Sequence, residues 1–157
     1  MKTTLLCIGK TDESFIKMGI ENYAKRLKHY VYFNISVIPD IKSTRHLTQE
    51  QQKTREGELI LKQLKNGDFV ILLDERGKAF RSVEFAKFLE QKIVGSVQHI
   101  VFVIGGPYGF SEEVYKRANE RLSLSKMTFS HQMIRLFFVE QLYRAFTIQR
   151  REPYHHE

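Results

Sequence analysis

Cysteine is almost absent from this sequence, with Cys7 the single example. One thiol cannot build an internal disulfide framework, and its place in an apolar run favours a small buried residue over a catalytic thiol. No apolar run approaches the roughly 18 residues that a membrane helix needs. The first residues also lack the cleavage-site pattern of a secretory signal. These absences predict a cytoplasmic protein with no membrane association.

The charge is unbalanced, with a formal net charge of +7 and a pI of about 9.5. Such a surplus makes an anionic partner plausible, and nucleic acid is the leading candidate. A solvated basic surface with no partner stays open as the alternative. The content of 42% hydrophobic and 27% charged residues is that of a globular protein. A length of 157 residues predicts a single domain covering 1–157.

Short apolar runs alternate with segments of helical periodicity, which predicts an α/β fold around a mostly parallel sheet flanked by helices. Helix starts are expected where Asp12, Thr48, Ser82 and Ser111 can cap the backbone, Thr48 forming a capping box with Gln51. The expected strands are Thr3–Ile8, Val31–Ile38, Phe69–Leu73, His99–Ile104 and at most a short one at Lys126–Phe129. The expected helices are about Glu13–His29, Thr48 to Asn66-Gly67, Ser82 to about Ile93, Glu112–Arg121 and Met133–Gln149.

The last predicted helix, written MIRLFFVEQLYRAFTI, is apolar around most of its circumference. A surface helix of a monomer needs one apolar stripe, so this helix must be covered on two sides. The sheet covers one side, and a second copy of the chain is the simplest cover for the other. The sequence therefore predicts a homodimer, with a helix buried centrally in a monomer as the alternative.

Three segments, two after predicted strands and one after the fourth predicted helix, are expected at the edge where α/β proteins bind ligands. They are Leu73–Gly77, the glycine loop Gly105–Gly109 and the segment Leu122–Phe129. The glycine spacing matches neither GxGxxG nor the phosphate loop GxxxxGK[ST], so a tight turn with no ligand stays open. The segment LSLSKMTF leaves many backbone polar groups in irregular chain, and a bound purine or ribose would pair with them.

The chain ends in RREPYHHE, which is either a frayed end or a cluster of catalytic groups. Two of its imidazoles are adjacent, which does not suit convergence on one metal ion. No GxSxG motif indicates a serine hydrolase. A nuclease that uses His131 with His155 or His156 as acid and base remains an alternative.

Taken together, LLDERGK, VFVIGGPYGF, LSLSKMTFSHQMIRLFFVEQLYRAFTI and PYHHE, in this order along the whole chain, closely resemble the ribosomal RNA large subunit methyltransferase H family. This family is a small branch of the SPOUT class of S-adenosylmethionine enzymes. The resemblance implies an α/β domain with a C-terminal deep trefoil knot and a homodimer. It also implies that the protein methylates N3 of a pseudouridine in 23S rRNA within the assembled ribosome.

The resemblance places the methyl donor's pocket on residues of this chain, and the side chains near the expected site suggest a mechanism, which is our hypothesis. Arg144 would stabilise negative charge on the substrate, and Tyr154 or His155 would deprotonate or orient the base. A noncatalytic ribosome- or RNA-binding factor with a nucleotide-like pocket is the rival reading, and no metal is expected. The methyl donor, S-adenosylmethionine, would be bound by Leu73, Gly105, Gly106, Leu124, Ser125, Lys126, Met127, Thr128 and Phe129.

Overall fold

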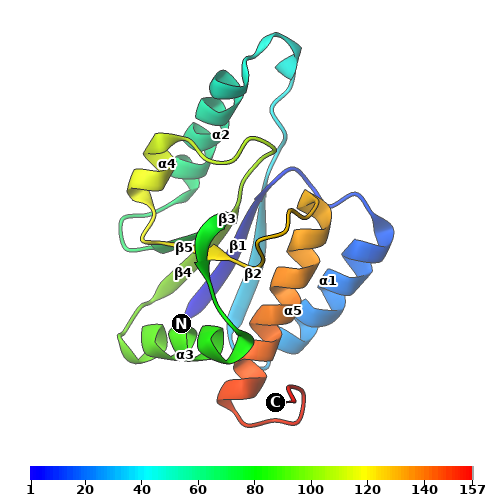
Figure 1. Cartoon of the computed structure of the whole chain (residues 1–157), viewed down its shortest axis with the longest axis vertical. Helices are drawn as coiled ribbons and strands as arrows, with labels where there is room; N and C mark the ends of the chain where they lie inside the picture. Colours follow the sequence, from blue (N-terminus) through cyan, green and yellow to red (C-terminus); the bar gives the residue numbers. More distant parts are fainter. Residues whose placement is uncertain (157) are drawn as a thin grey trace.

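The computed structural model describes residues 1–156 (Figure 1). These residues form five strands, five α-helices and one short 3-10 helix. In chain order they are β1 (Lys2–Ile8), α1 (Ser14–Leu27), β2 (Tyr32–Ile38), η1 (Thr44–His46), α2 (Gln49–Gln63), β3 (Phe69–Ala79), α3 (Ser82–Val94), β4 (His99–Ile104), α4 (Glu112–Arg117), β5 (Glu120–Ser123) and α5 (His131–Gln149).

The strands form one sheet in the order β2-β1-β4-β3-β5, and every neighbouring pair is parallel. Side chains alternate across it, so that in β4 Phe102 packs with α1, α3 and α5 while Val101 and Val103 pack with α2 and α4. Both faces are therefore covered, which explains why the central strands read as continuous apolar runs. The predicted α/β fold with a parallel sheet is confirmed.

The face of the sheet on which each connecting helix lies depends on the direction of its crossover. The connections through α1 and α3 step one way along the sheet and lie on one face, whereas those through α2 and α4 step the other way and lie on the opposite face. All four crossovers thus share one hand, as expected for parallel βαβ units.

The strand β3 is longer than predicted, and the predicted helix Glu112–Arg121 is shorter. That helix ends at Arg117 because Asn119 exchanges two hydrogen bonds with Val70, its amide donating to the Val70 carbonyl and its side chain accepting from the Val70 amide, both at 2.8 Å. These bonds bring the chain onto the sheet edge as β5. The second half of β3 then pairs with the end of β5, after a register shift between Leu73 and Lys78.

The short strand expected at Lys126–Phe129 is wrong, since these residues form an irregular loop. Serine side chains bind the backbone there: Ser123 Oγ donates to the Ser125 carbonyl at 2.8 Å, and Ser125 Oγ accepts from the Met127 amide at 3.0 Å. Local bonds of this kind compete with sheet formation.

Two of the predicted helix caps are confirmed and two are wrong. Thr48 forms the capping box with Gln51, and Ser111 accepts from the Val114 amide. At α1 the capping position is Glu13, with no side-chain bond, so Asp12 is not the cap. At α3 the cap position is Arg81, because Ser82 Oγ instead donates to Gln141 Oε1 of α5 at 2.7 Å.

The helix α5 packs against the sheet between α1 and α3 (Figure 1). Phe138, Val139 and Leu142 are fully buried on the sheet side, and Leu136 lies against Gly19 of α1. Most of the apolar surface that suggested a partner is therefore covered within the chain. Phe137 remains 41% exposed, so the homodimer stays a prediction.

Phe138 is the aromatic anchor of this face, with its ring centroid 4.6 Å from that of Phe102. Replacing Phe138 with alanine should lower the free energy of unfolding by about 3–5 kcal/mol. The missing ring would leave a cavity between the sheet and the helices, which the surroundings can fill only in part. Urea denaturation measures this loss. The control is Val94→Ala, whose side chain is 79% exposed at the end of α3 and should change stability by less than about 0.5 kcal/mol.

Candidate functional site

A cavity of about 510 Å³ lies at the carboxyl ends of β3, β4 and β5. Leu73, Ile104 and Leu122, at or near the ends of the paired strand segments, form its apolar floor. The loops that follow these strands form the walls, which is the position where parallel α/β sheets bind ligands. The three loops selected from the sequence are thus brought together by the fold.

The glycine loop needs its glycines for two reasons. Gly109 has a φ of 83°, a conformation that favours glycine, and its amide donates to the Gly106 carbonyl at 3.3 Å. A Cβ on Gly105 would lie 2.9 Å from the ring of Phe110, which is buried. At its three glycines the loop therefore presents bare backbone to the cavity, while Pro107 and Tyr108 add side chains to the same wall.

The segment that follows β5 forms the opposite wall. Met127 is 73% exposed, and the Phe129 ring lies 5.1 Å from that of Phe137 on α5. Among residues 1–156, the backbone amides of Lys126, Thr128 and Phe129 have no acceptor in the protein. Such a loop offers donors to a ligand that carries nitrogen or oxygen acceptors.

Two acidic side chains lie in the middle of β3, where its pairing with β5 shifts register. Asp74 accepts from the phenol of Tyr115 at 2.7 Å and from the Arg76 amide at 3.0 Å. Burial, and then the bond to Asp74, raise the pKa of Tyr115 to about 12, so this phenol stays a donor at neutral pH. Glu75 accepts from the Thr128 hydroxyl at 3.0 Å and links this loop to the segment after β5. The cavity lining carries these two carboxylates together with the cations Lys53 and Arg76, so it can meet a ligand that carries charges of both signs.

Almost all the residues predicted to bind a cofactor line this cavity. The exception is Lys126, which is exposed and lies outside the lining. Asp74 directly follows a predicted strand and was available from the sequence, whereas nothing in the pattern indicated Tyr115 on α4. The predicted residues that line the cavity are Leu73, Gly105, Gly106, Leu124, Ser125, Met127, Thr128 and Phe129.

The residues predicted to be catalytic form a separate cluster where the tail folds back on α5. Arg144 donates to Glu140 Oε1 at 2.6 Å and to His155 Nδ1 at 3.1 Å. Tyr154 also donates to Glu140 Oε1, at 2.8 Å, and a bond from Tyr30 to Glu152 fixes the chain before it. The described part of the tail is packed in this structure.

The tail cluster is rich in hydrogen-bond donors. Burial, followed by its hydrogen bonds with Tyr23 and Glu140, raises the pKa of Tyr154, so the phenol keeps its proton. Because a guanidinium can only donate, His155 Nδ1 must be the acceptor from Arg144. Arg144 Nε and His155 Nε2 are buried and have no hydrogen-bond partner among residues 1–156.

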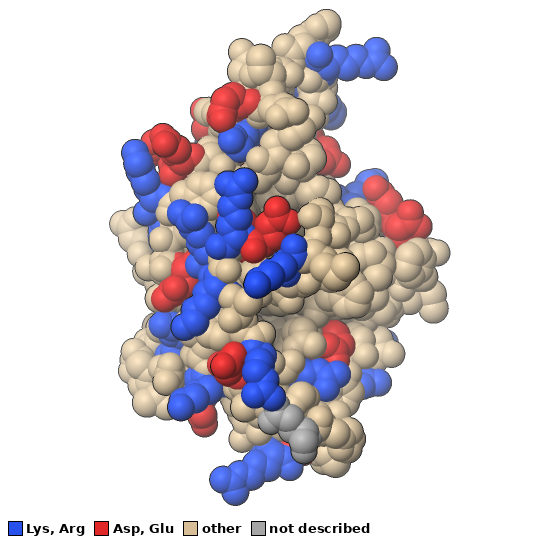
Figure 2. Space-filling model, in the orientation of Figure 1, with Lys and Arg blue, Asp and Glu red and all other residues tan. Residues whose placement is uncertain are grey.

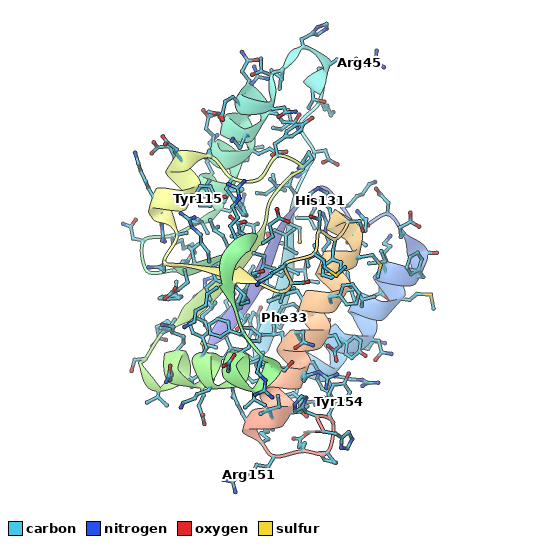
Figure 3. The ribbon with its side chains drawn as sticks, in the orientation of Figure 1. Phe33, Arg45, Tyr115, His131, Arg151 and Tyr154 are labelled. Carbon is cyan, nitrogen blue, oxygen red and sulfur yellow. The ribbon has the colours of Figure 1, made fainter. Side chains whose placement is uncertain are left out.

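The cluster and the cavity lie far apart within one chain. His131, at the start of α5, lines the cavity, and Arg144 is thirteen positions further along the helix, on the order of 20 Å at 1.5 Å per residue. Figure 3 shows His131 and Tyr154 toward opposite ends of α5. A reaction that uses both sets of residues cannot be completed by one chain in this conformation.

No helix within residues 1–156 has the length and apolar character to cross a membrane. Those residues also contain no group of three or more His, Cys, Asp or Glu side chains placed to hold a metal ion.

Known proteins similar to this chain share its full length. Residues 1–155 match a family model described as a predicted SPOUT methyltransferase. A protein of Christiangramia forsetii is 57% identical over 99% of both chains, and proteins of Parabacteroides distasonis and Bacteroides fragilis are 58% identical over 100% of both chains. All three are named ribosomal RNA large subunit methyltransferase H. The resemblance found in the motifs is confirmed, and the chain belongs to the SPOUT methyltransferase family.

Proposed function

We propose that this protein transfers a methyl group from S-adenosylmethionine to N3 of a pseudouridine in 23S rRNA, within assembled ribosomes in the cytoplasm. The observation that carries the proposal is the cavity beyond β3, β4 and β5, whose walls fit the donor. The relatives named for methylation of large-subunit ribosomal RNA support the choice of substrate.

The fit to the donor rests on three features of the cavity. Leu73 and Leu122 give an apolar floor for an adenine ring, while the glycine loop and the segment after β5 offer backbone groups to its edge and to the ribose. Asp74 and Glu75 place negative charge beside a cationic sulfonium. When bound, S-adenosylmethionine supplies an electrophilic methyl group.

A deep trefoil knot in the C-terminal part of the chain belongs to this proposal. It is supported by the double pairing of β3 with β5: Ile71–Leu73 pair with Glu120–Leu122, and Lys78 and Ala79 pair with Leu122 and Ser123. Residues 74–77 therefore form an excursion across the end of β5. Gly77 lies so close to this strand that a Cβ would be 2.7 Å from the Arg121 carbonyl carbon.

The tail cluster completes the active site from a partner subunit. Arg144 would stabilise the negative charge that develops on the pyrimidine ring, and Tyr154 and His155, held by their bonds to Glu140 and Arg144, would orient the base. The separation of cluster and cavity within one chain supports a homodimer in which each tail serves the other cavity. Exposed apolar side chains on the neighbouring helices α1 and α5 offer a contact surface: Phe15 at 61%, Met18 at 70% and Phe137 at 41%.

The charge distribution supports contact with RNA beside the cavity. Figure 2 shows Lys and Arg side chains gathered over β3, β5 and α4, whereas the surface over α5 is mostly uncharged. Arg76 lines the cavity, and Arg121 stacks on the Tyr115 ring at 4.1 Å. Phosphates of the RNA would lie along this surface, leaving the uncharged surface for the second subunit.

Donor binding is expected to stabilise the folded protein. At a concentration about 100 times its dissociation constant, S-adenosylmethionine should add about 2.7 kcal/mol to the free energy of unfolding. Thermal denaturation with S-adenosylmethionine, compared with ATP at equal concentration, measures this effect. Stabilisation by ATP alone would point to another nucleotide ligand.

Ribosomes lacking the modification should accept labelled methyl groups from the purified protein. Naked 23S rRNA should accept far fewer, because a domain of this size presents little surface for selecting one nucleotide. The modified position is identified by mass spectrometry of nuclease fragments. Tight ribosome binding without any transfer would instead favour the noncatalytic binding factor.

Mixed dimers test the shared active site. A tail-deficient variant truncated after Arg151 and a cavity-deficient variant such as Gly105→Val should each be inactive alone. Random mixing should restore about one quarter of the wild-type activity, because half of the dimers then contain one complete site. No recovery, although subunit exchange is verified by tag pull-down, would place both residue sets in the same chain's site.

A further inference from the structure

A second cavity, of about 350 Å³, lies at the carboxyl ends of β1 and β2. It is enclosed by α2, the loop after β2 and the start of α5. Gly106, Pro107 and His131 line both this cavity and the first one, so the two share a wall. A group bound in the second cavity would lie next to a methyl donor in the first.

Glu56 of α2 brings a buried carboxylate to this wall. The residue is 4% exposed; its Oε2 accepts from Gln52 at 3.4 Å, and its Oε1 has no partner. Both oxygens lie 2.4 Å from the place where a Cβ on Gly106 would stand. A side chain at position 106 would displace the carboxylate from this place beside the glycine loop. A buried, unpaired carboxylate oxygen is costly unless a ligand uses it.

Arg135 of α5 brings an unused donor to the same cavity. The residue is 3% exposed, and its two terminal nitrogens donate to Thr11 Oγ1 at 3.1 Å and to the Ile8 carbonyl at 2.8 Å. Its Nε is buried without an acceptor. The cavity thus contains one buried acceptor and one buried donor that no residue in the described part of the chain satisfies.

The charges around the cavity select the class of ligand. Asp12, Asp40 and Glu56 face Lys10 and Arg135, so a phosphate would meet more negative than positive groups. Within residues 1–156 no three carboxylate, His or Cys groups converge to hold a metal ion. A neutral ring that carries both N–H and C=O groups fits, and this is the hydrogen-bonding edge of a nucleobase.

The proposed reaction also needs a proton acceptor that the tail does not supply. The Nδ1 lone pair of His155 is used by Arg144, and the Tyr154 phenol donates to Glu140. His131 lines both cavities, but it is exposed at the start of α5, whereas Glu56 is buried beside the glycine loop. Glu56 Oε1 has no hydrogen-bond partner among the described residues and can therefore accept the proton.

We propose that the second cavity receives the acceptor nucleobase and that Glu56 Oε1 takes the proton from its ring N–H. This inference rests on the proposed function. The ring N–H bond breaks, its proton forms a bond to Glu56, and the ring nitrogen forms the new bond to the methyl carbon. The sulfur–methyl bond breaks and its electron pair stays on sulfur, so a sulfonium and a carboxylate become a thioether and a carboxylic acid.

The surroundings of Glu56 suit this role. Burial is the main cause that raises its pKa, Asp40 adds to the rise, and the bond from Gln52 opposes it. Lys10, Asp12, His131 and Arg135 are the other charged or titratable groups around the cavity. A raised pKa makes the carboxylate a better proton acceptor, and the base form is lost as the pH falls through that value.

The test compares Glu56→Gln with wild type and with Glu58→Gln, a matched change at an exposed position of the same helix. Single-turnover methyl transfer to ribosomes is measured at saturating donor from roughly pH 5 to pH 9. We expect Glu56→Gln to be about 100-fold slower or more and to lose the acid limb of the wild-type pH profile. Donor affinity, measured by calorimetry, should stay within about twofold of wild type.

A stability measurement without donor or RNA gives an independent readout. Because folding raises the pKa of Glu56, its contribution to stability is present at low pH and is lost as the pH rises through the folded value. Glu56→Gln should therefore melt at a higher temperature than wild type at about pH 8, with the difference shrinking toward pH 4. A carboxylate that stabilises the fold in its charged form, with a pKa lowered by folding, would show the opposite sign.

The outcomes separate this inference from the proposed function. Wild-type rates in Glu56→Gln, or loss of the acid limb in His131→Gln instead, would overturn this inference while leaving the proposed function standing. No transfer by wild-type protein to any ribosome would overturn the proposed function itself, and the inference with it.

Discussion

The double contact between β3 and β5 is the constraint on which the site depends. Asn119 fixes the start of β5 to Val70, and Lys78 and Ala79 hold its end. Between these contacts, residues 74–77 of β3 bulge out of the pairing with β5, and Gly77 allows the close approach to that strand. This bulge carries Asp74 and Glu75 to the cavity, while the end of β5 releases the segment that forms the opposite wall. The pairing of β3 with β5 thus positions both walls of the first cavity.

The two cavities and the tail divide the chemistry among separate parts of the chain. The first cavity presents backbone donors and carboxylates, which suit a cationic nucleoside. The second holds a buried acceptor on Glu56 and a buried donor on Arg135. The tail holds Arg144, Tyr154 and His155 as a bonded unit of donors. Unsatisfied buried groups recur in the second cavity and in the tail, and such groups are costly in a protein that binds nothing there.

The sequence left two explanations open for the apolar helix α5, namely burial in the centre of one chain and contact with a second copy. Phe138 and Leu142 face the sheet, and the α1 and α3 sides are covered within the chain. Phe137 stays exposed beside them, together with Phe15 and Met18 of α1. The apolar circumference therefore reflects central burial for the most part, and the smaller remainder is what the proposed homodimer would cover.

The sequence by itself determined the α/β class, the buried central strands, the caps at Thr48 and Ser111, and the family, because these depend on local periodicity and on the order of motifs along the chain. It also named eight of the residues that line the cavity. Only the tertiary structure decided that β5 is Glu120–Ser123, that Ser82 binds Gln141, and that Glu56 and Arg135 lie beside the glycine loop. Those features come from contacts between residues tens of positions apart, and no local pattern records which side chains a fold will leave buried and unpaired.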